Sequence, residues 1–231
     1  MAKRHSNSSG SDSIFHHFDE HLSLKTDNHK DFYRSLLEGY DSICYGYAGS
    51  AKTFISLGYA LRKLKQREIE KIIIIRSAVA TRDVGFLPGT EEEKMAIFET
   101  PYIKIVNDLL QRGDGYEVLK KRGMVEFLSS SYLRGLTFDN AIVIVDECQN
   151  YTFHEIDTIY TRTGENTQVI FVGDALQMDS GVGKEGSGFN HLVSVASNLE
   201  AFSVHNFGVD DIVRSAKVKS WIVATSLLKQ H

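Results

Sequence analysis

The sequence holds 231 residues, with 26 basic and 30 acidic side chains and a formal net charge of −4. Hydrophobic residues make up 42% and charged residues 24%, which excludes collagen-like, disulfide-rich and wholly disordered classes. A chain of this length forms one large domain with a sizeable core. The acidic balance gives nucleic-acid binding no support from composition.

The chain begins with a polar segment, residues 1–24, which is rich in serine and histidine and has few large apolar groups. This composition predicts a flexible tail before a domain that spans residues 25–231. His16, His17 and His21 have a spacing that could hold a metal on a helix, but no partner ligands follow, so we expect none there. With no apolar signal-peptide core and only strand-length apolar runs, we expect neither a signal peptide nor a membrane span.

After this segment, short apolar runs alternate with stretches of helical periodicity, which favours an α/β fold: a mainly parallel sheet with helices on both faces. The predicted strands cover residues 42–45, 71–76, 125–129, 141–146, 167–172 and 201–207. The predicted helices cover residues 31–38, 53–66, 91–99, 102–110, 153–163 and 218–229. Pro88 and Pro101 bracket the third helix. Cys44 and Cys148 lie in or beside apolar runs and are expected to be buried thiols of a reducing, cytoplasmic compartment.

The first predicted strand runs into a phosphate-binding loop, which leads directly into an amphipathic helix. The loop consists of Gly46, Tyr47, Ala48, Gly49, Ser50, Ala51, Lys52 and Thr53. Backbone N–H groups of such a loop turn inward around phosphates, and the helix N-terminus favours an anion. Glycine is usual before the lysine, so if Ala51 requires a positive φ, it costs about 1–2 kcal/mol. Taken alone, the loop has a second interpretation as a chance glycine-rich turn.

A second motif ends the fourth predicted strand, where a buried apolar run closes on Asp146 and Glu147. In this arrangement the first acid holds Mg²⁺ and the second polarises an attacking water. We therefore expect Lys52 and Thr53 to hold the β- and γ-phosphates, and Thr53 and Asp146 to hold Mg²⁺. The two motifs together predict the binding of a nucleoside triphosphate.

The fifth predicted strand runs into Gly173 and Asp174, with Gln177 shortly after them. A glutamine at a strand end can bond the γ-phosphate or the attacking water, although a simple polar turn is the alternative. A small-molecule kinase would instead carry an arginine-rich lid, and none is apparent in the sequence.

Five ordered blocks of the sequence resemble the PhoH family, single-domain P-loop ATPases related to the RecA-like core of superfamily 1 helicases. The resemblance covers residues 24–231, with blocks at residues 46–53, 76–79 followed by 85–89, 132–138, 145–150, and 173–174 with Gln177 and Asp179. It implies a RecA-like fold and hydrolysis of ATP with Mg²⁺, coupled to remodelling of single-stranded RNA or DNA. Family names refer to phosphate starvation, and members occur in bacteria and phages, which implies the cytoplasm of a bacterium or of a phage-infected cell.

The resemblance also implies roles for particular residues, with Glu147 and Gln177 as catalytic groups. The run Val209-Asp210-Asp211-Ile212-Val213-Arg214 resembles the family's late Asp-Val-Val-Arg block, which makes Arg214 the candidate arginine for the γ-phosphate; a helix-surface arginine is the alternative. Three positions depart from the family, which has glycine at Ala51, proline at Ser77 and an adenine-reading glutamine at His29. Base specificity therefore stays open.

Helicase-like motors cleave ATP between two cores, and the second core supplies an arginine. Only 52 residues follow Asp179, too few for another such core. The arginine must then come from the same core or from a neighbouring subunit, and we expect a homo-oligomeric ring, a hexamer as in RecA-like ATPases. Basic runs at residues 62–65 and 120–122 are either nucleic-acid contacts or solvated helix ends. The alternative function, favoured by Ala51, is a nucleotide-gated binding module with weak or no hydrolysis.

Overall fold

The computed structural model describes residues 14–77, 91–133, 135–174 and 188–228. Within these residues, six strands form one parallel sheet in the order β3-β2-β4-β5-β1-β6. The strands are β1 (Asp41–Gly46), β2 (Lys71–Arg76), β3 (Val125–Ser129), β4 (Ala141–Asp146), β5 (Thr167–Gly173) and β6 (Phe202–Phe207). The predicted α/β fold is confirmed, and each predicted strand is present to within one residue at either end.

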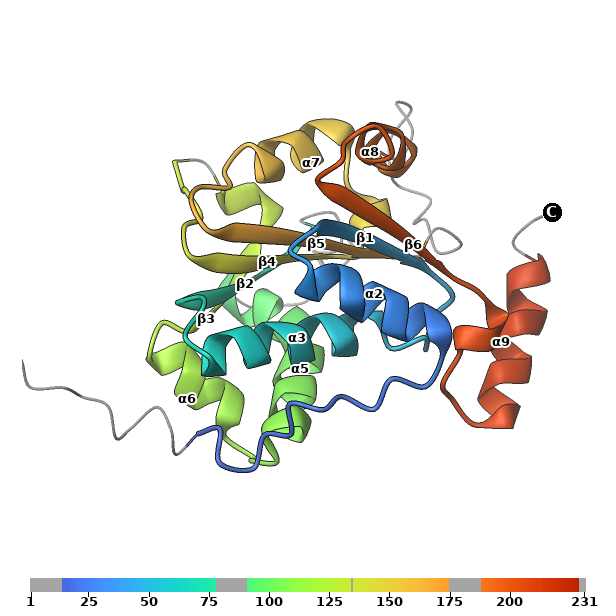
Figure 1. The fold of residues 1–231 in the computed structure, drawn as a ribbon, viewed down its shortest axis with the longest axis horizontal. Coiled ribbons are helices and arrows are strands. Elements are labelled where there is room, and N and C mark those ends of the chain that lie inside the picture. Colours follow the sequence, from blue (N-terminus) through green and yellow to red (C-terminus); the bar gives the residue numbers. More distant parts are fainter. Residues whose placement is uncertain (1–13, 78–90, 134, 175–187, 229–231) are drawn as a thin grey trace, which may run out of the picture.

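Helices cover both faces of the sheet (Figure 1). One face carries α2 (Asp27–Leu37), α3 (Lys52–Lys65), α5 (Glu91–Leu110) and α6 (Gly115–Lys121), and the other carries α7 (Phe153–Tyr160) and α8 (Phe189–Ala196). The last helix, α9 (Ala216–Leu228), lies beyond the β6 edge. Side chains of a strand alternate between the faces, so Ile72 and Ile74 join one apolar cluster while Ile73 and Ile75 join the other.

The helix boundaries differ from the prediction at Pro101. This proline lies inside the single helix α5 instead of separating two helices. A proline removes one helical hydrogen bond, to the carbonyl four residues earlier, and that residue, Ile97, is exposed on the helix surface. The sequence analysis also placed no helix at α6 or α8, which are only one to two turns long. Among the described residues, no helix is long and apolar enough to span a membrane.

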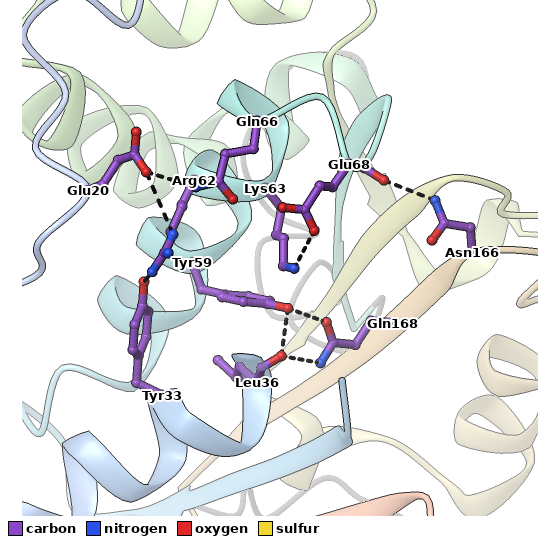
Figure 2. A network of polar contacts seen from close by, with 10 residues as sticks. All are labelled: Glu20, Tyr33, Leu36, Tyr59, Arg62, Lys63, Gln66, Glu68, Asn166 and Gln168. Atoms are coloured by element: carbon purple, nitrogen blue, oxygen red, sulfur yellow. Dashed lines mark hydrogen bonds and ion pairs between the residues drawn. The ribbon is translucent and has the colours of Figure 1, made fainter. Parts of the chain in front are cut away.

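The predicted flexible tail is wrong for residues 14–24. Ile14, Phe15 and Phe18 are buried and belong to the apolar cluster that also contains Ile72 and Ile74, called here the cluster beneath α3. Glu20 lies 3.0 Å from Lys65 Nζ and accepts a hydrogen bond of 2.9 Å from Gln66, and Figure 2 shows it beside Arg62. Apolar groups that are sparse in sequence can still form a packed strap when each one finds a site on the same helix.

A polar network at the amino edge of the sheet fixes α3 to its neighbours (Figure 2). The Tyr59 hydroxyl lies 2.6 Å from the Leu36 carbonyl oxygen and 2.7 Å from Gln168 Oε1. Gln168 Nε2 donates to the same carbonyl over 3.2 Å, so α2, α3 and β5 meet at one point. Because Tyr59 is only 1% exposed, these bonds are shielded from water. The network holds the helix whose opposite end carries the phosphate-binding loop.

Candidate nucleotide-binding site

The predicted phosphate-binding loop connects β1 to α3, and three of its residues have positive φ: Gly46 (+128°), Gly49 (+76°) and Ala51 (+62°). A Cβ atom built on Gly46 would lie 2.0 Å from the carbonyl oxygen of Phe207, so only glycine fits there. Ala51 has ψ of 17°, the left-handed conformation, and α3 begins at the next residue. The alanine therefore occupies the strained conformation that the loop requires.

Lys52 is the first residue of α3, and its ammonium points back into the loop. Lys52 Nζ donates to the carbonyl oxygens of Gly46 and Tyr47 over 2.9 and 2.8 Å, and to Ser50 Oγ over 3.2 Å. The side chain is 8% exposed. A buried cation enclosed by backbone is suited to bind an anion that replaces some of these acceptors.

Asp146 lies at the carboxyl end of β4, and β5 separates this strand from β1. At the carboxyl end of the sheet, Thr53 Oγ1 lies 3.4 Å from Asp146 Oδ1. The same oxygen accepts a hydrogen bond from the backbone N–H of Glu147 over 3.0 Å. The hydroxyl of Tyr102, a 1% exposed residue of α5, donates to Asp146 Oδ2 over 2.7 Å. This contact was not predicted, because nothing in the sequence indicates which face of α5 meets the strand ends.

The electrostatics of Asp146 reflect its burial. Burial and the charge of Glu147 raise the pKa of Asp146, while the Tyr102 hydroxyl and Arg76 act in the opposite direction. Arg76 pairs with Asp146 in the β2–β4 register, and its guanidinium lies 5.1 Å from the Phe98 ring centroid. A divalent cation would favour the carboxylate form, and the hydroxyl and carboxylate oxygens of Thr53 and Asp146 are ligands that Mg²⁺ prefers.

Glu147 follows β4 with φ of +54°, an uncommon conformation for a residue with a side chain. Its Oε2 accepts a hydrogen bond of 2.6 Å from Gln149 Nε2, and Gln149 Oε1 accepts the backbone N–H of Asp174 over 2.9 Å. Gln149 therefore links the carboxylate of Glu147 to the end of β5. Gln149 belongs to the family block at residues 145–150, but the sequence predicts no role for it. Gln177 lies outside the described residues.

Arg214 lies over the phosphate-binding loop of its own chain. A Cβ atom built on Gly49 would lie 2.8 Å from Arg214 Cγ, and the neighbouring Val213 donates its N–H to the Gly49 carbonyl oxygen over 3.0 Å. His29 is 1% exposed, and its Nδ1 accepts the Lys25 N–H over 3.3 Å. Burial lowers the pKa of His29, and the charge of Asp211 opposes that effect.

These residues surround one cleft of about 730 Å³. Most of the predicted site residues line it: Ala48, Gly49, Ser50, Ala51, Lys52, Thr53, Asp146, Glu147 and Arg214. Gly46 and Tyr47 contact Lys52 through their carbonyl oxygens but do not line the cleft. Four further polar residues, which belong to no motif and were not predicted, also line the cleft: Ser23, Lys25, Lys104 and Asp108. Among the described residues, no group of three or more His, Cys, Asp or Glu side chains could hold a metal by itself.

The family model described as PhoH-like protein matches residues 21–226 of this chain. The chain belongs to the PhoH family. It is 39% identical over 177 residues to Protein PhoH of Escherichia coli strain K12, which covers 74% of this chain and 49% of that protein. It is 32% identical over 204 residues to a PhoH-like protein of Bacillus subtilis strain 168, with 88% and 63% covered. The chain thus spans about half of the first relative and less than two thirds of the second.

Solved structures show a weaker likeness. The Pif1 helicase from Candida albicans is 13% identical, with a TM-score of 0.39, over 81% of this chain and 40% of that chain. The Sulfolobus solfataricus SWI2/SNF2 ATPase core in complex with dsDNA is 9% identical, with a TM-score of 0.44, over 80% and 45%. Both matches cover most of this PhoH-family chain and less than half of the other protein.

Proposed function

We propose that this PhoH-family chain binds ATP with Mg²⁺ in the cleft at the carboxyl edge of the sheet and hydrolyses the ATP. The supporting observation is the convergence of Lys52, Thr53, Asp146 and Glu147 on that cleft. They come from two separate parts of the sequence, and each has the chemistry that one part of phosphoryl transfer requires. When bound, ATP supplies the phosphoryl group and Mg²⁺ neutralises the charge that develops on it.

Each residue has one task in this proposal. Lys52 exchanges its contact to Ser50 Oγ for a phosphate oxygen, and Thr53 and Asp146 hold the metal through oxygen atoms. The Glu147 carboxylate orients the attacking water and accepts its proton, while Gln149 fixes the direction of that carboxylate by the 2.6 Å bond. Gln177 remains a proposed contact to the γ-phosphate or to the water.

The alternative, a binding module with weak or no hydrolysis, took its support from Ala51. That support is reduced, because Ala51 already has the left-handed conformation and the loop is closed around Lys52. The presence of a glutamate beside Asp146, held by Gln149, also favours hydrolysis over binding alone.

Coupling of hydrolysis to single-stranded nucleic acid is part of the proposal, and it rests on the family resemblance. The basic runs give it little support, because three of their lysines pair with acids of the same chain. Lys63 pairs with Glu68 over 2.5 Å, Lys65 with Glu20 over 3.0 Å, and Lys120 with Glu99 over 2.6 Å. The hexameric ring and the cytoplasmic location likewise stay predictions; light scattering of the purified chain tests the first.

The experiment measures ATP binding by calorimetry and ATP turnover with and without single-stranded RNA or DNA. We expect Lys52→Ala to abolish ATP binding, and Glu147→Gln to retain binding while turnover falls by roughly 100-fold or more. Lys30→Ala and Glu117→Gln, two exposed substitutions of the same kind, serve as controls and should behave as the unsubstituted chain. Unchanged ATP affinity in Lys52→Ala would refute the proposed site. Turnover that nucleic acid does not alter would refute the coupling.

A further inference from the structure

Asp211 is a buried carboxylate to which the site described above assigns no task. It ends the short helix η3 (Val209–Asp211) and is 3% exposed. Its Oδ1 accepts a hydrogen bond of 2.5 Å from Thr26 Oγ1, and its Oδ2 accepts bonds of 2.7 Å from Asn28 Nδ2 and 2.8 Å from the Gly208 N–H. No salt-bridge partner of Asp211 occurs among the described residues. A buried charge satisfied only by neutral donors is costly and depends on all of them.

The donors come from two segments that are remote in sequence. Thr26 caps α2, and its hydroxyl oxygen accepts the His29 N–H over 3.2 Å while the same hydroxyl donates to Asp211. Gly208 begins the turn that Asp211 closes. The carboxylate therefore ties the start of α2 to the turn after β6, in the way that a capping acid closes a helix.

Two and three residues beyond Asp211, the chain contacts the phosphate-binding loop. Val213 bonds the Gly49 carbonyl oxygen over 3.0 Å, and Arg214 lies against the open face of Gly49, where a Cβ atom would be 2.8 Å from its Cγ. The position of Arg214 is thus set by a turn whose other end is held by Asp211. A cation at this place can reach the phosphates that the loop would hold.

We propose that Asp211 is a positioning residue that holds Arg214 over the phosphate-binding loop of the same chain, so that this arginine acts within its own subunit. The inference rests on the proposed ATPase function and deepens it. Arg214 meets the γ-phosphate, and Asp211 acts on the reaction only through Arg214. A neighbouring subunit is then not required to supply the arginine.

The test is a double-mutant cycle on the full chain with Asp211→Asn and Arg214→Ala. We expect Arg214→Ala to lower kcat by roughly 10³-fold and Asp211→Asn by roughly 10- to 100-fold, with ADP affinity nearly unchanged because ADP lacks the γ-phosphate. In the Arg214→Ala background, Asp211→Asn should cause no further loss of kcat. Losses that multiply in the double variant would overturn the inference, since Asp211 would then act by another route.

Asp41→Asn is the matched control for general damage to the fold. Asp41 is a partly buried carboxylate at the start of β1, at the opposite end of the strands from Asp211. It accepts hydrogen bonds of 2.8 Å from the Tyr160 hydroxyl and 2.7 Å from the Val169 N–H. We expect it to lower the melting temperature as Asp211→Asn does, but to leave kcat unchanged. An equal fall of kcat in both variants would overturn the positioning role.

A mixing experiment tests whether Arg214 acts on the ATP bound to its own chain or on the ATP bound to a neighbouring chain. Arg214→Ala chains mixed with Lys52→Ala chains should recover no ATPase activity, because neither chain carries a complete site. Recovered activity would show that Arg214 reaches a neighbour's loop and would overturn the inference. Failure of the proposed function is distinguishable, since the unsubstituted chain would then show neither ATP binding nor turnover.

Discussion

Replacing Ala51 by glycine should stabilise the protein slightly. Ala51 is the only non-glycine residue with positive φ between Asp41 and Lys65, and its conformation of φ 62°, ψ 17° is one that glycine adopts without strain. The substitution keeps the shape of the loop and removes the steric cost of the methyl group. We therefore expect a higher melting temperature and an ATP affinity within about threefold of the original.

The magnitude follows from three opposing contributions. The left-handed conformation costs an alanine about 1–2 kcal/mol, and glycine removes this cost. Glycine adds about 0.5–1 kcal/mol of chain entropy to the unfolded state. The half-buried methyl group, which packs against the cluster beneath α3, contributes about 0.4 kcal/mol that is lost. The balance favours glycine by about 0.4 kcal/mol, which corresponds to a rise of about 1–2 °C in a domain of this size.

Scanning calorimetry checks the sign of this stability change, and two further glycine substitutions serve as comparisons. Gln111 also has positive φ (+52°), is exposed and lies after α5, so Gln111→Gly should give a rise of similar or larger size. Ala60 is fully buried in α3, and Ala60→Gly should lower stability by about 2 kcal/mol through lost burial and helix propensity. A lower melting temperature for Ala51→Gly would refute the steric reasoning. A large gain in ATP affinity would show that the loop is not preformed.

Four other substitutions have expected outcomes. Tyr102→Phe removes the hydroxyl that orients Asp146, so the Mg²⁺ concentration for half-maximal turnover should rise roughly tenfold, and an unchanged metal requirement contradicts this role. Burial lowers the pKa of His29 below its usual 6.5, so the unfolded chain binds more protons than the folded chain, and stability is lost as the pH falls below that value. His29→Gln should remove part of this loss, measured as the change in melting temperature between pH 7.5 and pH 5.5. Burial lowers the pKa of His205 as well, so the remaining slope should respond to His205→Gln. Gly46→Ala places a Cβ atom 2.0 Å from a backbone oxygen and should cost at least about 3 kcal/mol, seen as a large fall in melting temperature or failure to fold.

The strands were predictable because they lie in the middle of the fold, covered by helices on both faces of the sheet. Parallel strands buried on both faces are typically unbroken apolar runs, and the run Ile72–Ile75 contributes to the apolar clusters on both faces. Strand order and the packing of residues 14–24 were not predictable, since both depend on contacts between remote segments. Phe15 and Phe18 are isolated apolar residues in a polar stretch of sequence, and only the folded chain brings them into one cluster with residues of α3. Pro101 was misplaced for a related reason: a proline predicts a break, but a helix can continue when the lost bond lies on its exposed side.

The candidate site likewise has a part that the sequence predicts and a part that it does not. The loop and the paired acids are local patterns, because one strand end supplies several groups with fixed spacing, and the structure brings Lys52, Thr53, Asp146 and Glu147 to one cleft. The residues that orient them come from other elements: Tyr102 from α5, and Gln149 from the turn after β4. A single sequence shows which residue types could donate a hydrogen bond but not which acceptor they reach. The residue that positions a catalytic group is therefore the part that a pattern search misses.

Under the proposed function, the closed loop also determines which contacts of Lys52 a nucleotide would replace. An ammonium has three hydrogens, and Lys52 already directs them to two carbonyl oxygens and the Ser50 hydroxyl, so each phosphate contact it gains replaces a loop contact. The contact to Ser50, at 3.2 Å, is the longest of the three and the least costly to exchange. Because Gly46 and Tyr47 do not line the cleft, the contacts of their carbonyls to Lys52 can persist while the third hydrogen turns to the phosphate. The loop thus keeps its shape before and after binding, which is why an alanine held at positive φ is a cost to stability more than an obstacle to the nucleotide.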